Sequence, residues 1–141
     1  MPDVIQLIEQ DHREVEKLFQ TFQETGYSAL ASVICTELDA HAAAEEETFY
    51  PVVRADVPYG VTLATEGEDE HAQARQLIGR IRRTSDREHV RELMNELEQL
   101  VQHHVEEEEH EMLPHARRTL GEARLVEVGV AFESVKARSQ A

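Results

Sequence analysis

The sequence contains one helical pattern twice, and this repeat limits the folds open to the chain. When His12 is aligned with His71, and His41 with His104, the apolar residues of the first half fall on those of the second. The matched pairs are Asp11 and Glu70, Val15 and Ala74, Leu18 and Leu77, Phe19 and Ile78, Phe22 and Ile81, Leu30 and Leu93, Ile34 and Leu97, Leu38 and Val101, Glu45 and Glu108, Phe49 and Met112, and Pro51 and Pro114. Two copies of a helical hairpin pack into a bundle with a pseudo-two-fold axis, so corresponding residues are expected near that axis.

Apolar residues recur at helical spacing over long stretches, and no stretch alternates as a strand would. The pattern predicts helices over about residues 3–24, 28–50, 66–83 and 85–112, with a weaker one over 120–138. The predicted fold class is therefore all-α, an antiparallel up-down four-helix bundle over residues 1–115 built from two duplicated αα-hairpins. Residues 116–141 are expected to add a short C-terminal helix that packs on the bundle or trails it.

Glycine, proline and capping residues mark where these helices end. Gly26 suits the left-handed cap of the first helix, and Pro51 and Pro114 are expected to end the second and the fourth. Ser85 begins a Ser-x-x-Glu capping box that starts the fourth helix. Residues 51–66 are rich in turn formers and are predicted to be a long loop.

The charge of the chain limits the kinds of partner that it is expected to bind. It carries 29 acidic against 14 basic side chains, a formal charge of −15 over 141 residues. This excess repels phosphate backbones and anionic lipids, so a cation is a better partner than a nucleic acid or a membrane. The single Cys35 excludes an internal disulfide and fits a reducing compartment. With no signal-peptide pattern and no apolar stretch of membrane-spanning length, a cytoplasmic protein is expected.

Polar residues interrupt the apolar stripes at corresponding places. Each of the first and third predicted helices has one inward histidine, and each of the second and fourth has a His-x-x-x-Glu pair. The interior would then hold four imidazoles and two carboxylates at one level: His12, His41, Glu45, His71, His104 and Glu108. A lone core histidine is usually just hydrogen-bonded, but a duplicated set with two glutamates favours a metal site.

The chemistry of these six residues suits a metal ion. A buried carboxylate costs several kcal/mol unless it is paired or bound to a cation, and no Lys or Arg lies near them on the stripes of the second and fourth helices. Residues four apart share a helix face, so each His-x-x-x-Glu pair is able to reach one ion. Imidazole and carboxylate ligands favour iron, manganese or zinc.

Other histidines and glutamates have simpler interpretations. His89, His110 and His115 are expected to be ordinary surface residues. Because they lie off the stripe, a group on the fourth helix is expected to form a solvated acidic face: His103, Glu106, Glu107 and Glu109.

The ordered motifs resemble those of the hemerythrin-like, or His-His-Glu cation-binding, domains. They are an isolated His12, then His41-Ala-Ala-Ala-Glu45 followed by Phe49-Tyr50-Pro51, then His71, then His104-Val-Glu-Glu-Glu108 followed by Met112-Leu113-Pro114. The resemblance covers about residues 1–115. It implies two iron ions, bridged by Glu45 and Glu108 and by an oxo group, with the four histidines as terminal ligands.

One position departs from the family pattern. Oxygen-carrying members have His-x-x-x-His in the third helix, whereas this chain has Arg75 four residues after His71, and a guanidinium does not ligate. Of about twelve positions around two octahedral irons, about two would stay open. Tyr50 is a candidate ligand or hydrogen-bond donor if Pro51 distorts the helix enough to turn it inward, and otherwise a packing residue.

The residues and the resemblance together leave three functions open. The favoured one is a non-haem di-iron protein that reacts with O2, hydrogen peroxide or nitric oxide, as a catalase-like or peroxidase-like oxidoreductase would. The alternative is an iron or oxygen sensor, or an O2-binding module without turnover. A ferritin-like iron oxidase would instead use Glu-x-x-His pairs, which begin here at Glu9, Glu68 and Glu107.

Overall fold

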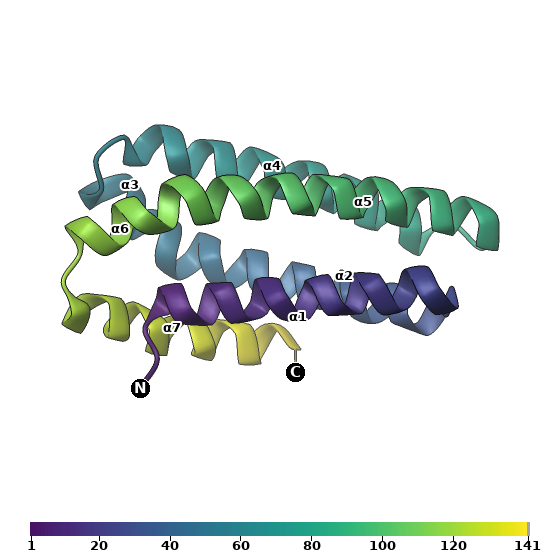
Figure 1. The fold of residues 1–141 in the computed structure, drawn as a ribbon, viewed down its shortest axis with the longest axis horizontal. Helices are drawn as coiled ribbons and strands as arrows, with labels where there is room; N and C mark the ends of the chain where they lie inside the picture. Colours follow the sequence, from purple (N-terminus) through teal and green to yellow (C-terminus); the bar gives the residue numbers. More distant parts are fainter. Residues whose placement is uncertain (141) are drawn as a thin grey trace.

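The computed structural model describes residues 1–140, and within them every regular element is helical. The elements in chain order are α1 (Val4–Thr25), α2 (Ser28–Ala44), η1 (Glu45–Phe49), α3 (Tyr50–Asp56), α4 (Gly60–Arg82), α5 (Arg87–Glu107), η2 (Glu108–Met112), α6 (Leu113–Thr119) and α7 (Glu122–Gln140). The all-helical prediction is confirmed. Figure 1 shows the four long helices lying lengthwise beside one another.

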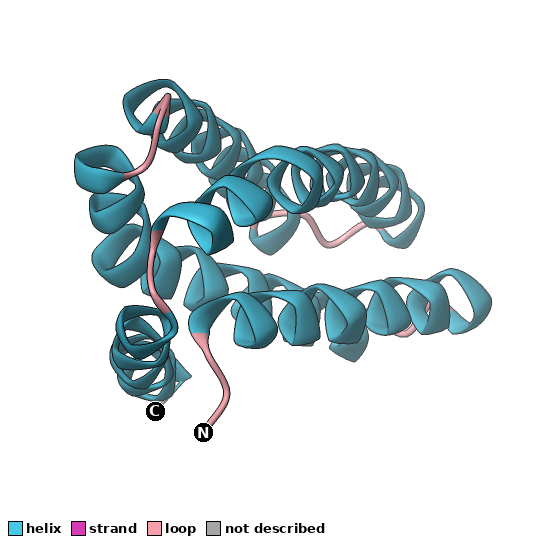
Figure 2. Ribbon diagram, turned by 60° about the vertical axis from the view of Figure 1, so that its left-hand side comes forward, coloured by secondary structure: helices cyan, strands magenta, loops and turns pink. Residues whose placement is uncertain are grey.

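Two helix pairs, the C-terminal helix α7 and the short helices α3 and α6 are packed together. Helix α1 packs on α2, and α4 packs on α5, each pair being consecutive in the chain and joined by a short turn. Gly26 takes the expected left-handed conformation at φ 66° after α1, and its N–H donates to the carbonyl of Phe22. Helix α7 packs on both α2 and α1, at the lower edge of the view in Figure 1 and seen almost end-on in Figure 2.

The core consists of two apolar clusters with a polar layer between them. One cluster, at the end of the molecule formed by α3, α6 and α7, includes Ile8 and Phe132. The other, toward the α1–α2 and α4–α5 turns, includes Val15 and Leu97. On α1, His12 lies between Ile8 and Val15, so the polar layer is enclosed from both ends.

The expectation that Pro51 and Pro114 end their helices was wrong. At both places the helix widens into a π-turn and continues, because the proline falls in the first turn of the next segment, α3 or α6, where no N–H donor is needed. The N–H of Tyr50 donates to the carbonyl of Glu45 five residues back, and that of Leu113 donates to Glu108. The repeat therefore includes a duplicated π-turn.

Two other boundaries were also wrong. Most of the predicted loop over residues 51–66 is helical, since α3 runs to Asp56 and α4 already starts at Gly60. Helix α5 is capped by Asp86 rather than Ser85, and the Asp86 carboxylate accepts the backbone N–H of His89. Asp caps a helix as well as Ser does, so the start moved by one residue without loss of the cap.

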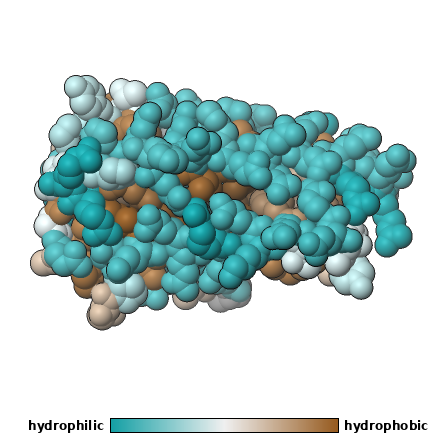
Figure 3. Space-filling view, in the orientation of Figure 1, coloured by the Kyte–Doolittle hydropathy of each residue, from teal (hydrophilic) through white to brown (hydrophobic). Residues whose placement is uncertain are grey.

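Hydrophilic side chains cover most of the face shown in Figure 3, and hydrophobic residues show through mainly along its middle. Among the helices of residues 1–140, none combines the length and the apolar character needed to cross a bilayer.

Candidate metal centre

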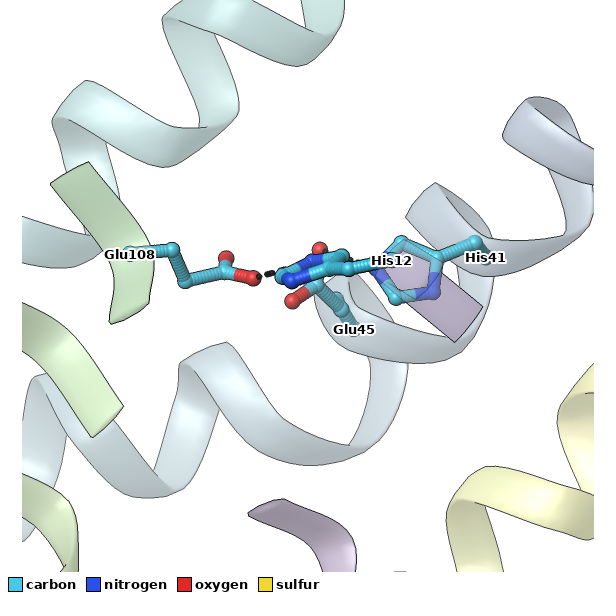
Figure 4. Close-up of side chains that lie close together, drawn as sticks. All are labelled: His12, His41, Glu45 and Glu108. Carbon is cyan, nitrogen blue, oxygen red and sulfur yellow. Dashed lines mark ion pairs between the residues drawn. The ribbon is translucent and has the colours of Figure 1, made fainter. Parts of the chain in front are cut away.

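The structure brings together the six polar residues that interrupt the apolar stripes. They come from α1, α2, η1, α4, α5 and η2, and every histidine turns its Nε2 toward a glutamate oxygen. The Nε2–Oε distances are 3.1 Å for His12 and Glu108, 3.2 Å for His41 and Glu45, 3.1 Å for His71 and Glu45, and 3.3 Å for His104 and Glu108. Figure 4 shows the Glu108 carboxylate pointing at His12, with His41 and Glu45 beside them.

The ligand atoms form two groups that share one carboxylate. The first cluster is His12, His41, Glu45 and Glu108, and the second cluster is Glu45, His71 and His104. Within each group the nitrogen and oxygen atoms lie within 4.8 Å of one another. Glu45, which is fully buried, belongs to both clusters.

Unsatisfied buried atoms show that these residues fit a cation. Four of the site's buried atoms lie close to one another but make no well-oriented hydrogen bond among the described residues: Nε2 of His12, Nε2 of His41, Oε2 of Glu45 and Oε1 of Glu108. Buried polar atoms are nearly always satisfied, and a group of orphaned imidazole nitrogens and carboxylate oxygens is the donor set of a borderline metal ion.

Four outer carboxylates fix the orientation of the four imidazoles. The Nδ1–H of each histidine donates to a carboxylate on a neighbouring helix: His12 to Glu109 at 2.6 Å, His41 to Asp11 at 2.8 Å, His71 to Glu46 at 2.6 Å and His104 to Glu70 at 2.6 Å. This assignment of the proton to Nδ1 leaves the lone pair of Nε2 aimed into the cluster. Such outer carboxylates orient metal-ligating histidines and raise their basicity.

The outer carboxylates follow the internal repeat, and their positions next to the inner residues are the one sequence signal that points to them. Asp11 and Glu70 directly precede His12 and His71, whereas Glu46 and Glu109 directly follow the two inner glutamates. Each acid serves a histidine of another helix, which the sequence alone does not specify. The expectation that Glu109 lies on a solvated face was wrong, since its side chain is 19% exposed and binds His12.

Arg75 stands four residues after His71, where the sequence departs from the His-x-x-x-His pattern, and it contacts an outer carboxylate. Its guanidinium donates to both oxygens of Glu46, at 3.0 and 2.9 Å, and Glu46 in turn holds His71. Arg13 of α1 donates to one oxygen of Glu109, the outer carboxylate that holds His12. Arg75 therefore stands at the place of a fifth histidine, where it binds Glu46 and lines the cavity beside the imidazoles.

The π-turn at η1 places Tyr50 inside the cluster. On a regular helix Tyr50 would face away from His41, but the wider turn rotates it inward to full burial. Its hydroxyl donates to Oε2 of Glu108 at 2.6 Å and lies 3.5 Å from Nε2 of both His71 and His104. The Tyr50 ring stacks on His71 at an interplanar angle of 10°. Tyr50 is therefore turned inward as a hydrogen-bond donor to Glu108.

Gly67 makes the room that Tyr50 needs. A Cβ at position 67 would lie 2.6 Å from the Tyr50 hydroxyl oxygen, closer than any ordinary contact.

We expect Gly67→Ala to destabilise the apo protein by about 1–3 kcal/mol through overpacking. Gly79→Ala on the same helix should instead stabilise it by about 0.5–1 kcal/mol, because its Cβ meets only the flexible Arg83 side chain at 3.3 Å. Urea unfolding measures the free energy of unfolding of both variants. An equal increase of that free energy in both would contradict this account of Gly67.

Protons take the place of a cation when the cluster is free of metal. Burial lowers the pKa of His41, but Glu45 and Asp11 outweigh burial and raise that pKa to about 10. Burial raises the pKa of Glu45, yet His41 and the other imidazoles hold it well below the usual range. Burial also raises the pKa of Tyr50, helped by Glu108 and Glu45, so its phenol stays protonated as a donor.

A small apolar cavity of about 40 Å³ lies against the four imidazoles. Its remaining walls are mainly aliphatic, from all four long helices, and include Val15, Leu38, Ile78 and Val101. A cavity needs at least about 10–15 Å³ to hold one water molecule, so this one has room for a molecule of a few atoms.

The remaining candidate residues lie outside the cluster. Glu9 is exposed, Glu68 binds Arg54 at 2.6 Å, and Glu107 lies 3.0 Å from His103. None of these three glutamates faces the inner histidines, which disfavours the ferritin-like arrangement. His89 and His110 are exposed as expected, and His115 is half-buried with its Nδ1–H donated to the Glu111 carbonyl.

The chain is similar to known proteins over most of its length. The family model described as the hemerythrin HHE cation binding domain matches residues 3–116. A protein of Nostoc sp. strain PCC 7120 named "DNA nickase" is 28% identical over 139 residues, which cover 95% of this chain and 39% of that protein. The chain thus spans well under half the length of that relative. No solved structure matches the chain.

Proposed function

Because the chain belongs to the hemerythrin HHE cation-binding domain family, we propose that it is a non-haem di-iron protein that reacts with O2, hydrogen peroxide or nitric oxide. In this proposal the long helices form an antiparallel up-down bundle over residues 1–115, and residues 116–141 form a helix added to it. The single observation that carries the proposal is the pair of buried His/Glu clusters that share Glu45.

We assign one iron to each cluster. His12 and His41 would be terminal ligands of one ion, His71 and His104 of the other, and Glu45 and Glu108 would bridge them. The orphaned Nε2 and carboxylate oxygens of the first cluster support this assignment. When bound, the ions would supply the redox chemistry, which belongs to the cofactor rather than to the side chains.

The other residues would orient ligands, exclude water and hold protons. The four outer carboxylates would keep every Nδ1–H in place, and Tyr50 would either complete the second cluster or donate its hydroxyl proton to Glu108. The aliphatic cavity beside the imidazoles limits access to small molecules, which supports dioxygen, peroxide and nitric oxide as reactants. Arg75 in place of a fifth histidine would leave more than one exchangeable position, and this favours turnover over reversible O2 storage.

DNA cleavage, suggested by the name of the Nostoc relative, is less well supported. The relative is longer than twice this chain, so its activity need not lie in the shared part. A formal charge of −15 also opposes contact with phosphates. We therefore propose that nucleic acid is not a partner.

Metal analysis with an absorption spectrum, followed by assays of peroxide and nitric oxide, tests the proposed function. We expect two irons per chain, near-ultraviolet charge-transfer bands, and faster peroxide loss with iron-loaded protein than with apo protein. Peroxide that survives equally long with both forms, together with a spectrum that nitric oxide leaves unchanged, would contradict turnover. A reversible colour change on deoxygenation in that case would favour the O2-binding or sensing module.

A further inference from the structure

Helix α7 contacts His41, a residue of the first cluster. The helix lies beyond residues 3–116, the part of the chain that the family shares. Its Phe132 ring meets the His41 ring edge-on, with centroids 5.7 Å apart and an interplanar angle of 77°. One turn further, the Lys136 ammonium donates to Oδ1 of Asp11 at 2.6 Å.

The two oxygens of Asp11 have different partners, and this fixes the carboxylate. Oδ1 accepts from Lys136, and Oδ2 accepts the Nδ1–H of His41 at 2.8 Å. Lys136 is itself held, since its side chain is 18% exposed and its ammonium lies 3.5 Å from Glu37 of α2. A chain of contacts thus leads from α7 through Asp11 to His41. Without the ammonium, the carboxylate would be free to rotate about its terminal torsion, which has a broad energy minimum.

Among residues 1–140, no lysine or arginine pairs with Glu70, the acid of the second half that corresponds to Asp11. Glu70 accepts from His104 through Oε1. Its Oε2 lies 3.6 Å from His103, and the Glu107 carboxyl lies beside both. The His103 side chain is 63% exposed and therefore anchors Glu70 far less firmly than a half-buried lysine anchors Asp11. The internal repeat makes the two halves alike, and α7 makes them different.

We propose that Lys136 is a positioning residue that fixes His41 through Asp11 and so strengthens metal binding at the first cluster but not at the second. The inference about affinity rests on the proposed function, because it requires that each cluster bind an ion. The inference about position does not, because the hydrogen bond between His41 and Asp11 exists in the apo protein.

Anaerobic titration with ferrous iron tests the affinity of each cluster. Lys136→Met keeps the aliphatic stem and removes the ammonium. We expect it to lower the affinity for one of the two ions about tenfold, the lower end of the range for residues that support a ligand. The affinity for the other ion should change by less than about twofold. Lys136→Arg should restore most of the loss. Arg124→Met is the matched control, because Arg124 joins α7 to Asp56 at 2.6 Å without touching an outer carboxylate.

Proton NMR of the apo protein tests the positioning without metal. The Nδ1–H of His41 should exchange with water at least about tenfold faster in Lys136→Met, whereas those of His71 and His104 should keep their rates. The proposal would be overturned by an unchanged exchange rate at His41 or by an equal loss of affinity for both ions. It would also be overturned if Lys136→Met lost only thermal stability, and lost no more of it than Arg124→Met. Wild-type protein that binds no iron would overturn the proposed function and the affinity claim, while the exchange rates would still decide whether Lys136 positions His41.

Discussion

Glu45→Gln should abolish binding of both metal ions, the largest effect expected of any single substitution in this chain. Glu45 belongs to both clusters, with Oε1 at 3.1 Å from Nε2 of His71 and 3.2 Å from Nε2 of His41. The amide keeps the shape of the carboxylate but removes its charge, and four imidazoles with one carboxylate left are a poor site for two divalent ions. Metal analysis after loading and desalting should give less than about a tenth of the wild-type iron.

The chain offers a matched control for this substitution. Glu47→Gln removes a carboxylate from the same π-turn, but the Glu47 side chain is 59% exposed and points away from the cluster. It should keep two ions per chain. Glu108→Gln should also lose iron, because Glu108 lies 3.1 Å from His12 and 3.3 Å from His104. Retention of two irons by both Glu45→Gln and Glu108→Gln would rule out the bridging assignment.

The inner cluster could be predicted from sequence because each of its residues breaks an apolar stripe. A histidine or glutamate at a core position of an amphipathic helix stands out, and the duplication shows it twice. The outer carboxylates do not stand out, because in a chain with 30% charged residues Glu46 and Glu109 look like any other surface acid. What distinguishes them is contact with a histidine on another helix, which depends on how the helices pack.

The short helices and Lys136 could not be predicted for related reasons. A proline suits both the end of one helix and the first turn of another, so Pro51 and Pro114 left two possibilities that only the packing of α3 and α6 decides. The role of Lys136 depends on where α7 docks, and its weak periodicity gives no register against α1. Local signals thus located the centre, whereas tertiary contacts set the residues that support it.

The stability of the apo protein and its affinity for metal should depend on pH with opposite signs. In the folded apo protein the pKa of His41 is raised to about 10, against about 6.5 in the unfolded chain. The stabilising effect of this proton is complete below about pH 6.5 and is lost as pH rises toward 10. The apo protein should therefore melt at a lower temperature at pH 9 than at pH 6.5.

Metal binding must displace that proton, because only the neutral imidazole ligates. The affinity should rise about tenfold per pH unit for each proton displaced between pH 6.5 and 10, and more steeply if His12, His71 and His104, whose pKa values are also raised, lose protons together. Toward acid pH the affinity keeps falling, and bound iron should be lost by about pH 4, where free carboxylates take up protons.

Thermal melts of apo and iron-loaded protein from pH 5 to pH 9 test both pH dependences, that of apo stability and that of metal affinity. The gap between the two melting temperatures should widen as pH rises, because the apo protein loses its imidazolium–carboxylate pairs while the loaded protein does not depend on them. Glu45→Gln should show no gap at any pH, since it binds no metal. A gap that narrows with pH in the wild type, or iron that stays bound well below pH 4, would mean that the buried histidines and glutamates are not the ligands.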